Sequence, residues 1–218
     1  MSPTVLLLIK HLLLLLVCLT GDKLLQVIQK PALLKAFADN LTHALIGLIA
    51  TEIIVRNFRD QLGRTEFYLL LGFGFFLSSW IDLDHFIEAR SFHLHDATNL
   101  HKRGFMHNSV IFVVLFVALL ILVHVQVNFS TSTWTGIAFV AFFTHQIRDS
   151  IRRGLWFRGP YLDYSTPPVN YWLYLLLIQL CPHVIISLLE LQFHRESMAA
   201  RSFGGGEFVA KYKPLEVV

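Results

Sequence analysis

The feature that most constrains this chain is a succession of long apolar segments separated by short polar connections. One of them, EFYLLLGFGFFLSSW, continues without any linker into IDLDHF. A helix that crosses a bilayer needs roughly 20 mostly apolar residues, since each residue adds about 1.5 Å to its length. Such segments occupy residues 4–20, 38–55, 67–86, 107–127, 133–150 and 170–191. The sequence therefore predicts an all-α, polytopic helical membrane protein with about six transmembrane helices in one bundle.

The composition supports this class of protein. The chain is 55% hydrophobic and 15% charged, whereas soluble domains have about 45–50% apolar and about 25% charged residues. The formal net charge is only +3 and the basic residues are spread over many connections, which excludes nucleic acid as a partner. Cys18 and Cys181 both lie in apolar segments, so they predict neither a disulfide framework nor a thiolate metal site. We expect the lipid bilayer to be the main partner and the endomembrane system to be the location.

The domain organisation is simple. Residues 1–193 are expected to form a single helical transmembrane domain. Residues 194–218 contain three consecutive glycines among scattered charges and predict a flexible polar C-terminal tail. The first apolar segment has no basic stretch before it and no small-residue cleavage site after it, which favours a membrane anchor over a cleaved signal peptide.

Acidic and histidine side chains gather at the ends of four apolar segments. An Asp or Arg near the bilayer centre costs about 2.5–3.5 kcal/mol, so such residues usually face the bundle interior and have a function. Within two of the groups, helical spacings of three and four residues place two side chains on one face. The residues concerned are His43 in DNLTHALIG, Asp82, Asp84 and His85 in IDLDHF, Arg103 and His107 in KRGFMH, and His145 and Asp149 in THQIRDS.

The order of these groups along the chain supplies a second argument. They fall at the start of the second segment, the end of the third, the start of the fourth and the end of the fifth. In an up-and-down bundle all four positions lie on the same side of the membrane. His124 lies about 25 Å along its helix from His107 and is excluded. The sequence therefore predicts one polar cluster at one end of the bundle.

Imidazole and carboxylate ligands together suit a divalent transition metal such as zinc, manganese or iron. The candidate ligands could hold one ion, or two about 3.5–4 Å apart. Asp84 or Asp149 would orient a water activated by the metal or accept its proton, and Arg103 would hold a phosphate or another anion. The candidate metal ligands are His43, Asp82, His85, His107, His145 and Asp149.

Less specific interpretations stay open for most of these residues. The stretch IDLDHF could be an interfacial helix end that contacts lipid headgroups, and His107 could be an ordinary interfacial histidine. Asp149 has Arg152 and Arg153 within one helical turn and could be ion-paired at a helix end. His43 could be a hydrogen-bonded histidine between helices, and Arg103 could be an ordinary charged loop residue.

The motifs above, together with KRGFMHNS, THQIRDSIRRGLW, PPVNYWLY and CPH, resemble the eukaryotic transmembrane protein 267 family over roughly residues 20–190. More distantly they resemble the bacterial LexA-binding, inner-membrane-associated metal-dependent hydrolases, whose pattern runs Thr-His, Pro-Asp-x-Asp-His, His-Arg-Gly-x-x-His-Ser and His-x-x-x-Asp. Three departures stand out: Ile81 replaces the proline, Lys102 separates His101 from Arg103, and Asn108 separates His107 from Ser109.

The resemblance implies a metal-dependent hydrolase with a His/Asp site at one membrane face and a lipid-like or phosphoester substrate. The alternative is a non-catalytic multi-pass membrane protein, such as an assembly factor, a partner-binding subunit or an ion-handling protein, in which the polar cluster is structural.

Overall fold

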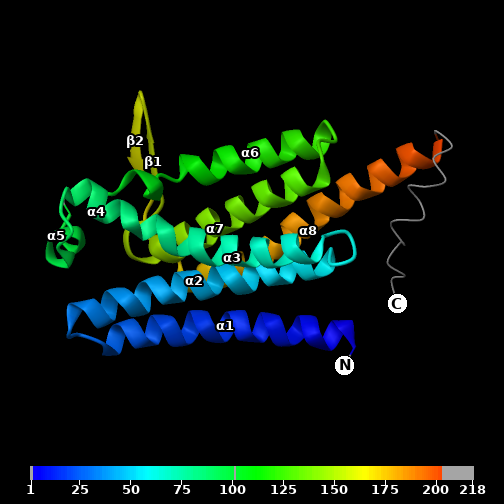
Figure 1. The fold of residues 1–218 in the computed structure, drawn as a ribbon. Coiled ribbons are helices and arrows are strands. Elements are labelled where there is room, and N and C mark those ends of the chain that lie inside the picture. Colours follow the sequence, from blue (N-terminus) through cyan, green and yellow to red (C-terminus); the bar gives the residue numbers. More distant parts are fainter. Residues whose placement is uncertain (1, 101, 203–218) are drawn as a thin grey trace.

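The computed structural model describes residues 2–100 and 102–202. These residues form a bundle of long helices that run broadly along one direction, the last of them obliquely, with a small β-hairpin projecting from one end (Figure 1). The elements in chain order are α1 (Pro3–Val27), α2 (Ala32–Asn57), α3 (Arg64–Trp80), the 3₁₀ turn η1 (Ile81–Leu83), α4 (Asp84–Ala89), α5 (Leu94–Thr98), the 3₁₀ turn η2 (Phe105–His107), α6 (Val110–His124), α7 (Phe129–Arg153), β1 (Trp156–Gly159), β2 (Leu162–Ser165) and α8 (Tyr171–Ser202).

The structure is mostly helical, as predicted, but it also contains a small two-stranded sheet, and the predicted number of six transmembrane helices is not confirmed. Among the described residues, four helices are long and apolar enough to cross a bilayer: Pro3–Val27, Ala32–Asn57, Arg64–Ala89 and Tyr171–Met198. The helix α6 is apolar but has only 15 residues. The helix α7 has 25 residues but carries many polar side chains. Length and apolarity therefore single out α1, α2, α3 with its continuation, and α8.

The helix α7 is the central element of the bundle. It packs against α2, α3, α6 and α8, and 13 of its 25 residues are buried. Polar residues of α7 therefore contact other helices, which explains why its sequence is less apolar than that of its neighbours.

Two apolar clusters hold the helices together. Lipid tails are as apolar as these side chains, so in a bilayer the clusters stabilise the bundle through close van der Waals contact rather than through removal of apolar surface from water. The larger joins α2, α3, α6, α7 and α8 through buried residues that include Ile54, Leu70, Leu119, Val140 and Ile185. The smaller joins α1, α2, α7 and α8 through Leu14, Ile46, Ile147, Tyr174 and Ile178, among others.

Some boundaries differ from those expected. The first helix passes through Gly21 and ends only at Val27, because Gly21 packs closely on the Thr42 side chain of α2. The helix α8 continues to Ser202, so the domain boundary predicted at residue 193 falls inside it. The remainder of the predicted tail, residues 203–218, lies outside the described residues.

The β-hairpin was not predicted. Its strands have only four residues each, and they lie in a segment that the sequence marks as a connection because of its Gly and Pro residues. Two strands of this length are marginal without support from the rest of the fold. Contacts between β1 and α6 supply that support.

Close packing of α2 against α3 leads to a prediction at Gly74. A methyl group there would collide with the Thr51 side chain and lie 3.2 Å from the Gly47 carbonyl oxygen. We expect Gly74→Ala to lower the free energy of unfolding by about 1–3 kcal/mol through overpacking. Thermal unfolding in detergent measures the change. The matched control is Gly72→Ala in the same helix, where a methyl group meets nothing within 4 Å. Equal melting temperatures for the two variants would contradict the prediction.

Candidate metal centre

The site lies at the end of the bundle where α3 ends and α4, α5 and the hairpin are found (Figure 1). At Trp80 the helix α3 passes into η1 and then α4, and this short stretch carries three of the candidate residues. Its position is fixed by Asn40 of α2, which donates to the Ser79 carbonyl oxygen at 3.1 Å and accepts from the Ser79 hydroxyl. The end of α3 is therefore tied to the start of α2.

Four of the candidate residues converge on one point. Asp82 comes from η1, His107 from η2, and His145 and Asp149 from α7. One potential ligand atom from each residue lies within 4.8 Å of the others. His145 Nε2 lies 3.4 Å from Asp82 Oδ1 and 3.6 Å from Asp149 Oδ2. His107 Nε2 lies 3.6 Å and 3.4 Å from the same two oxygens.

Hydrogen bonds at the far sides of the two imidazoles define their tautomers. Ser78 presents a carbonyl oxygen 2.8 Å from His145 Nδ1, and a carbonyl oxygen only accepts, so Nδ1 carries the proton. The His107 Nδ1 atom lies 3.1 Å from the Asp84 carboxylate, which likewise accepts. In the neutral form of each ring the Nε2 atom therefore carries the lone pair, and the two Nε2 atoms face each other at 3.2 Å. Two lone pairs and two carboxylates directed at one point form a donor set that suits a divalent cation.

Asp84 contacts His107 on the side of the ring that faces away from the other three residues. Its side chain is fully buried, and Oδ2 accepts from the Met106 backbone N–H at 2.7 Å as well as from His107. Gly104 packs directly on the carboxylate and leaves no room for a Cβ atom. A carboxylate that orients a metal-binding histidine through its second nitrogen is a common arrangement in metal sites. The structure thus places Asp84 behind His107, away from the group of four.

His85 belongs to a second group, with Asp84 and His107. Its Nδ1 atom lies 3.1 Å from Asp84 Oδ1 and 3.1 Å from the Asp82 carbonyl oxygen. The side chain is 32% exposed. His85 is therefore adjacent to the group of four: it contacts Asp82, and its ring meets the His107 ring edge to face with the centroids 4.6 Å apart.

His43 lies on the other side of His145. The two rings stack, with centroids 3.8 Å apart and planes inclined by 20°. Arg148 Nη1 donates to His43 Nε2 at 2.9 Å, so the lone pair of that nitrogen is already used. Among the described residues, neither group of potential metal ligands includes His43.

Arg103 lies at the C-terminus of α7. Its guanidinium donates to the carbonyl oxygens of Arg153 at 2.5 Å and Gly154 at 2.9 Å. Partial burial, followed by the nearby positive charge of Arg153, lowers the pKa of Arg103 from its usual value. These contacts cap the last turn of α7. His101 lies outside the described residues.

A second polar network, which the sequence did not predict, adjoins the site. Arg148 is fully buried and donates to Asp22 of α1 at 2.9 Å and to Asp39 of α2 at 2.7 Å. Asp22 also accepts from the hydroxyl groups of Tyr171 at 3.2 Å and Tyr174 at 3.0 Å. One sequence feature could have indicated this network: Arg148 is a cation between His145 and Asp149, in a segment expected to lie in the membrane.

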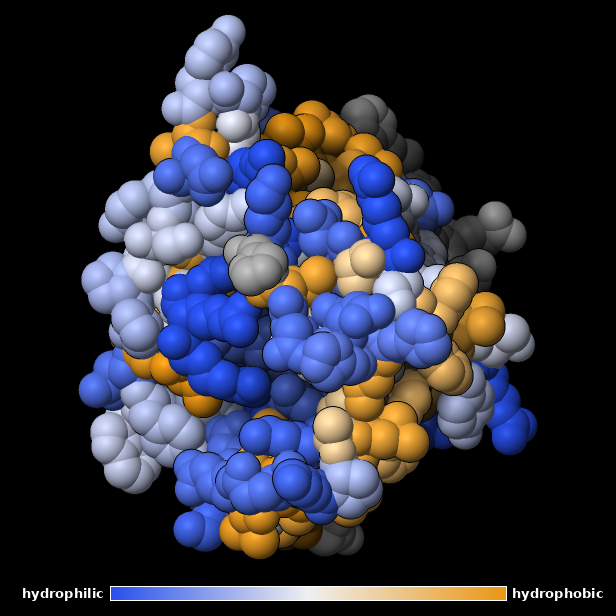
Figure 2. Space-filling view, turned by 90° about the vertical axis from the view of Figure 1, so that its left-hand side faces the viewer, coloured by the Kyte–Doolittle hydropathy of each residue, from blue (hydrophilic) through white to orange (hydrophobic). Residues whose placement is uncertain are grey.

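The site reaches the surface through its carboxylates. Asp82 and Asp149 keep 25% and 29% of their side chains exposed, whereas His145 is buried. Figure 2 views this end of the molecule and shows hydrophilic side chains gathered over it, around a shaded hollow near its centre. The carboxylates are therefore the part of the site that solvent or a ligand meets first.

The fold and the site together define a helical membrane protein with a His/Asp cluster at one end of its bundle. The family model described as YdjM inner membrane protein matches residues 39–203, which include all eight candidate residues. The chain belongs to this family.

Similar full-length proteins agree with this assignment. The chain is 32% identical over 187 residues to transmembrane protein 267 of Bos taurus, covering 84% of this chain and 83% of that protein. The protein of the same name from Danio rerio is 32% identical over 84% of this chain and 81% of its own length. The one from Xenopus laevis is 33% identical over 84% and 83%. No solved structure matches the chain. The predicted resemblance and the integral membrane location are thus confirmed.

Proposed function

We propose that this protein is a membrane-embedded, metal-dependent hydrolase that binds a divalent transition ion through Asp82, His107, His145 and Asp149. The observation that supports this most directly is the pair of imidazole Nε2 atoms 3.2 Å apart, each with its Nδ1 already engaged by an oxygen acceptor. Facing lone pairs repel unless a cation or a proton lies between them. The two carboxylates would balance the charge of a divalent ion.

We also propose that α6 and α7 complete a six-helix bundle in the membrane. Because α7 is surrounded by α2, α3, α6 and α8, its polar residues do not need to face lipid. At 1.5 Å per residue α6 is about 22 Å long. The preceding turn η2 and its flanking residues extend the path of the chain toward the site end.

In the proposed hydrolysis, the residues of the site have different roles. A divalent ion would supply an activated water near neutral pH. Asp84 and the Ser78 carbonyl oxygen hold the two imidazoles in the tautomer that ligation requires. Asp149 or Asp82, both partly exposed, would accept a proton at the entrance to the site.

Arg103 would bind an anionic group of the substrate. Its two hydrogen bonds to α7 use two of the five guanidinium N–H groups and hold the side chain in place. An arginine fixed in this way is well suited to phosphate. The position of the site at one end of a membrane bundle favours a lipid-like or phosphoester substrate.

One observation favours the non-catalytic alternative. The network of Arg148 with Asp22, Asp39 and His43 joins α1, α2 and α7 next to the cluster. A polar cluster that continues into such a network would also suit a protein whose polar residues only hold helices together, such as an assembly factor or a partner-binding subunit.

Metal analysis and a hydrolysis assay distinguish these functions. We expect the purified protein to contain about one equivalent of zinc, manganese or iron, and to release phosphate from phosphatidic acid in mixed micelles. Asp82→Ala and His145→Ala should lose both properties. The control is Asp96→Ala, which removes an exposed carboxylate at the same end of the bundle. Protein without metal would overturn the site, and metal without hydrolysis of phosphatidic acid or of soluble phosphoesters would favour the non-catalytic alternative.

A further inference from the structure

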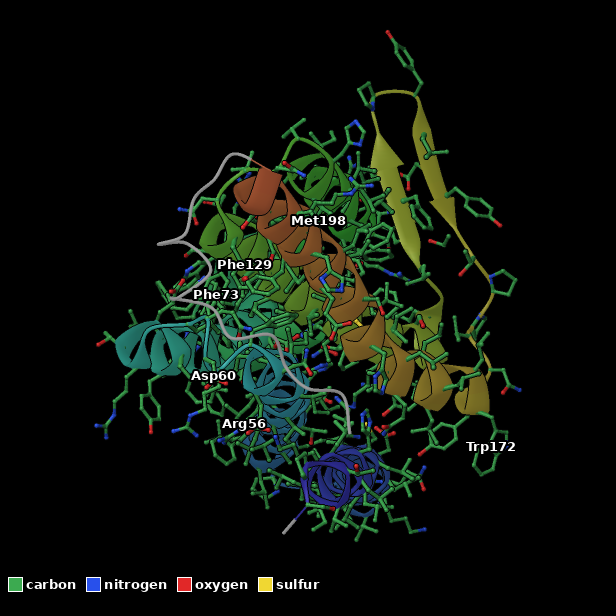
Figure 3. The ribbon with its side chains drawn as sticks, turned by 90° about the vertical axis from the view of Figure 1, so that its right-hand side faces the viewer. Arg56, Asp60, Phe73, Phe129, Trp172 and Met198 are labelled. Carbon is green, nitrogen blue, oxygen red and sulfur yellow. The ribbon has the colours of Figure 1, made fainter. Side chains whose placement is uncertain are left out.

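The β-hairpin β1–β2 extends sideways from the bundle. Figure 1 shows it nearly perpendicular to the long helices, at the end where the candidate metal centre lies. Figure 3, which views the molecule from the opposite end, shows the same hairpin reaching beyond the outline of the helices. If the helix axes follow the membrane normal, the hairpin lies in the plane of the membrane, at the level of one surface.

The strand register gives this hairpin two different faces. Paired residues in antiparallel strands share a face, and residues two apart along a strand do as well. One face therefore carries Phe157 with its partner Tyr164, and Leu162 opposite Gly159. Leu162 is 49% exposed and Tyr164 54% exposed. This face is apolar and aromatic, and much of it is uncovered.

The opposite face of the hairpin is more polar. It carries Trp156 paired with Ser165, and Arg158 paired with Asp163. The Trp156 indole N–H donates to Asp163 at 2.8 Å, and the Arg158 guanidinium lies 5.7 Å from the centre of the Trp156 ring. Tyr161, at the turn between the strands, is fully exposed. The hairpin is thus amphipathic across its thickness, with a tyrosine at its tip.

The hairpin lies next to a surface that membrane lipids are expected to cover. The hairpin contacts α6, whose outer side exposes a row of aliphatic residues: Val113, Val114, Val117, Leu120 and Ile121. Tyrosine rings are enriched at the boundary between hydrocarbon and water, where the ring is buried and the hydroxyl stays hydrated. The hairpin runs parallel to the membrane surface next to a lipid-facing helix, and it carries apolar and tyrosine side chains. Both its orientation and its side chains therefore suit the lipid interface.

We propose that the hairpin β1–β2 lies in the interfacial layer of the leaflet at the site end, with Phe157, Leu162 and Tyr164 in contact with the upper acyl chains of phospholipids. Tyr161 anchors its tip among the headgroups. The strand β1 is held beside the candidate metal centre: Asn108 donates to the Arg158 carbonyl oxygen at 2.8 Å and accepts from the Arg158 backbone N–H at 3.1 Å, and Asn108 follows His107 directly. The hairpin thereby sets the depth of the site at the lipid headgroups. This proposal does not depend on whether the site performs hydrolysis.

Fluorescence quenching in vesicles tests the arrangement. Single cysteines introduced by Tyr161→Cys, Leu162→Cys or Tyr164→Cys are labelled with an environment-sensitive fluorophore. The full chain is then reconstituted into phosphatidylcholine vesicles that contain lipids spin-labelled near the headgroup. The native Cys18 and Cys181 are buried, and the unsubstituted protein measures their background labelling.

We expect spin-labelled lipid to quench the three labels at least twofold more than a label at Arg158→Cys on the polar face of the same hairpin. Iodide in the water should quench the Arg158→Cys label more than the labels at 162 and 164. A second control is Asp60→Cys, in the connection at the opposite end of the bundle (Figure 3). Gel filtration of each variant verifies that the fold is kept.

Two results would overturn the proposal. Strong iodide quenching without lipid quenching at 162 and 164 would mean that the face is free in water and open to a protein partner. Equal lipid quenching on both faces would mean that the hairpin has no preferred side toward the bilayer.

Discussion

Replacing Arg148 by methionine is expected to lower the free energy of unfolding by about 3–5 kcal/mol, because the change leaves buried acids without their cation. Arg148 is fully buried and contacts Asp22, Asp39 and His43, which belong to two other helices. Methionine fills a similar volume but neutralises no charge. Chemical or thermal unfolding in detergent, followed by circular dichroism, measures the loss.

Two further variants give this experiment its controls. Arg153→Met removes an exposed cation one turn later in the same helix and should change stability by no more than about 0.5 kcal/mol. Arg148→Lys keeps the charge but not the planar fork that reaches several partners, so its stability should be intermediate. If Arg148→Met unfolds like Arg153→Met, the network does not hold α1 and α2 to α7.

The second large effect is expected at Asp84. Asp84→Asn should weaken metal binding by about 10–100-fold, the usual effect of removing a group that orients a ligand. The amount bound at saturating metal should be unchanged, since Asp84 supports His107 from behind the group of four. Competition between the protein and a chelator of known affinity measures the change. Asp96→Asn, in an exposed position at the same end, is the control.

Either of two outcomes would contradict the role assigned to Asp84. An unchanged affinity would mean that the carboxylate does not orient His107. Complete loss of the bound metal, even at saturation, would mean that Asp84 is itself a ligand. The close packing of Gly104 on the carboxylate argues for a fixed position, because even a small shift of Asp84 would bring it against the backbone of that turn.

Much of the bundle could be predicted from apolar segment lengths alone. All six predicted segments lie mainly in helices, because runs of about 17–22 apolar residues leave the backbone few other ways to satisfy its hydrogen bonds in lipid. The number of transmembrane helices was harder to predict, because a helix at the centre of the bundle can cross the membrane with fewer apolar residues than a helix that faces lipid. The position of α7 inside the bundle is a tertiary property that relaxes the demand for apolar residues.

The candidate site, too, could be predicted only in part. The helical spacing of His145 and Asp149, and the side of the membrane on which each group emerges, were sufficient to predict the neighbourhood of Asp82, His107, His145 and Asp149. The sequence could not rank the ligands. The separate surroundings of His43 and Asp84 depend on contacts with Arg148, Met106 and Gly104, which come from other parts of the chain.

The pairing of Asp22 with Arg148 also bears on the order in which the protein is made. The two residues are 126 positions apart, so the ribosome completes five intervening helices of the chain before Asp22 meets its cation. An ionised carboxylate is costly in hydrocarbon until it is neutralised. The first helix can therefore take its final place only after α7 has been synthesised. Until then, Asp22 must stay in contact with water or with the membrane-insertion machinery.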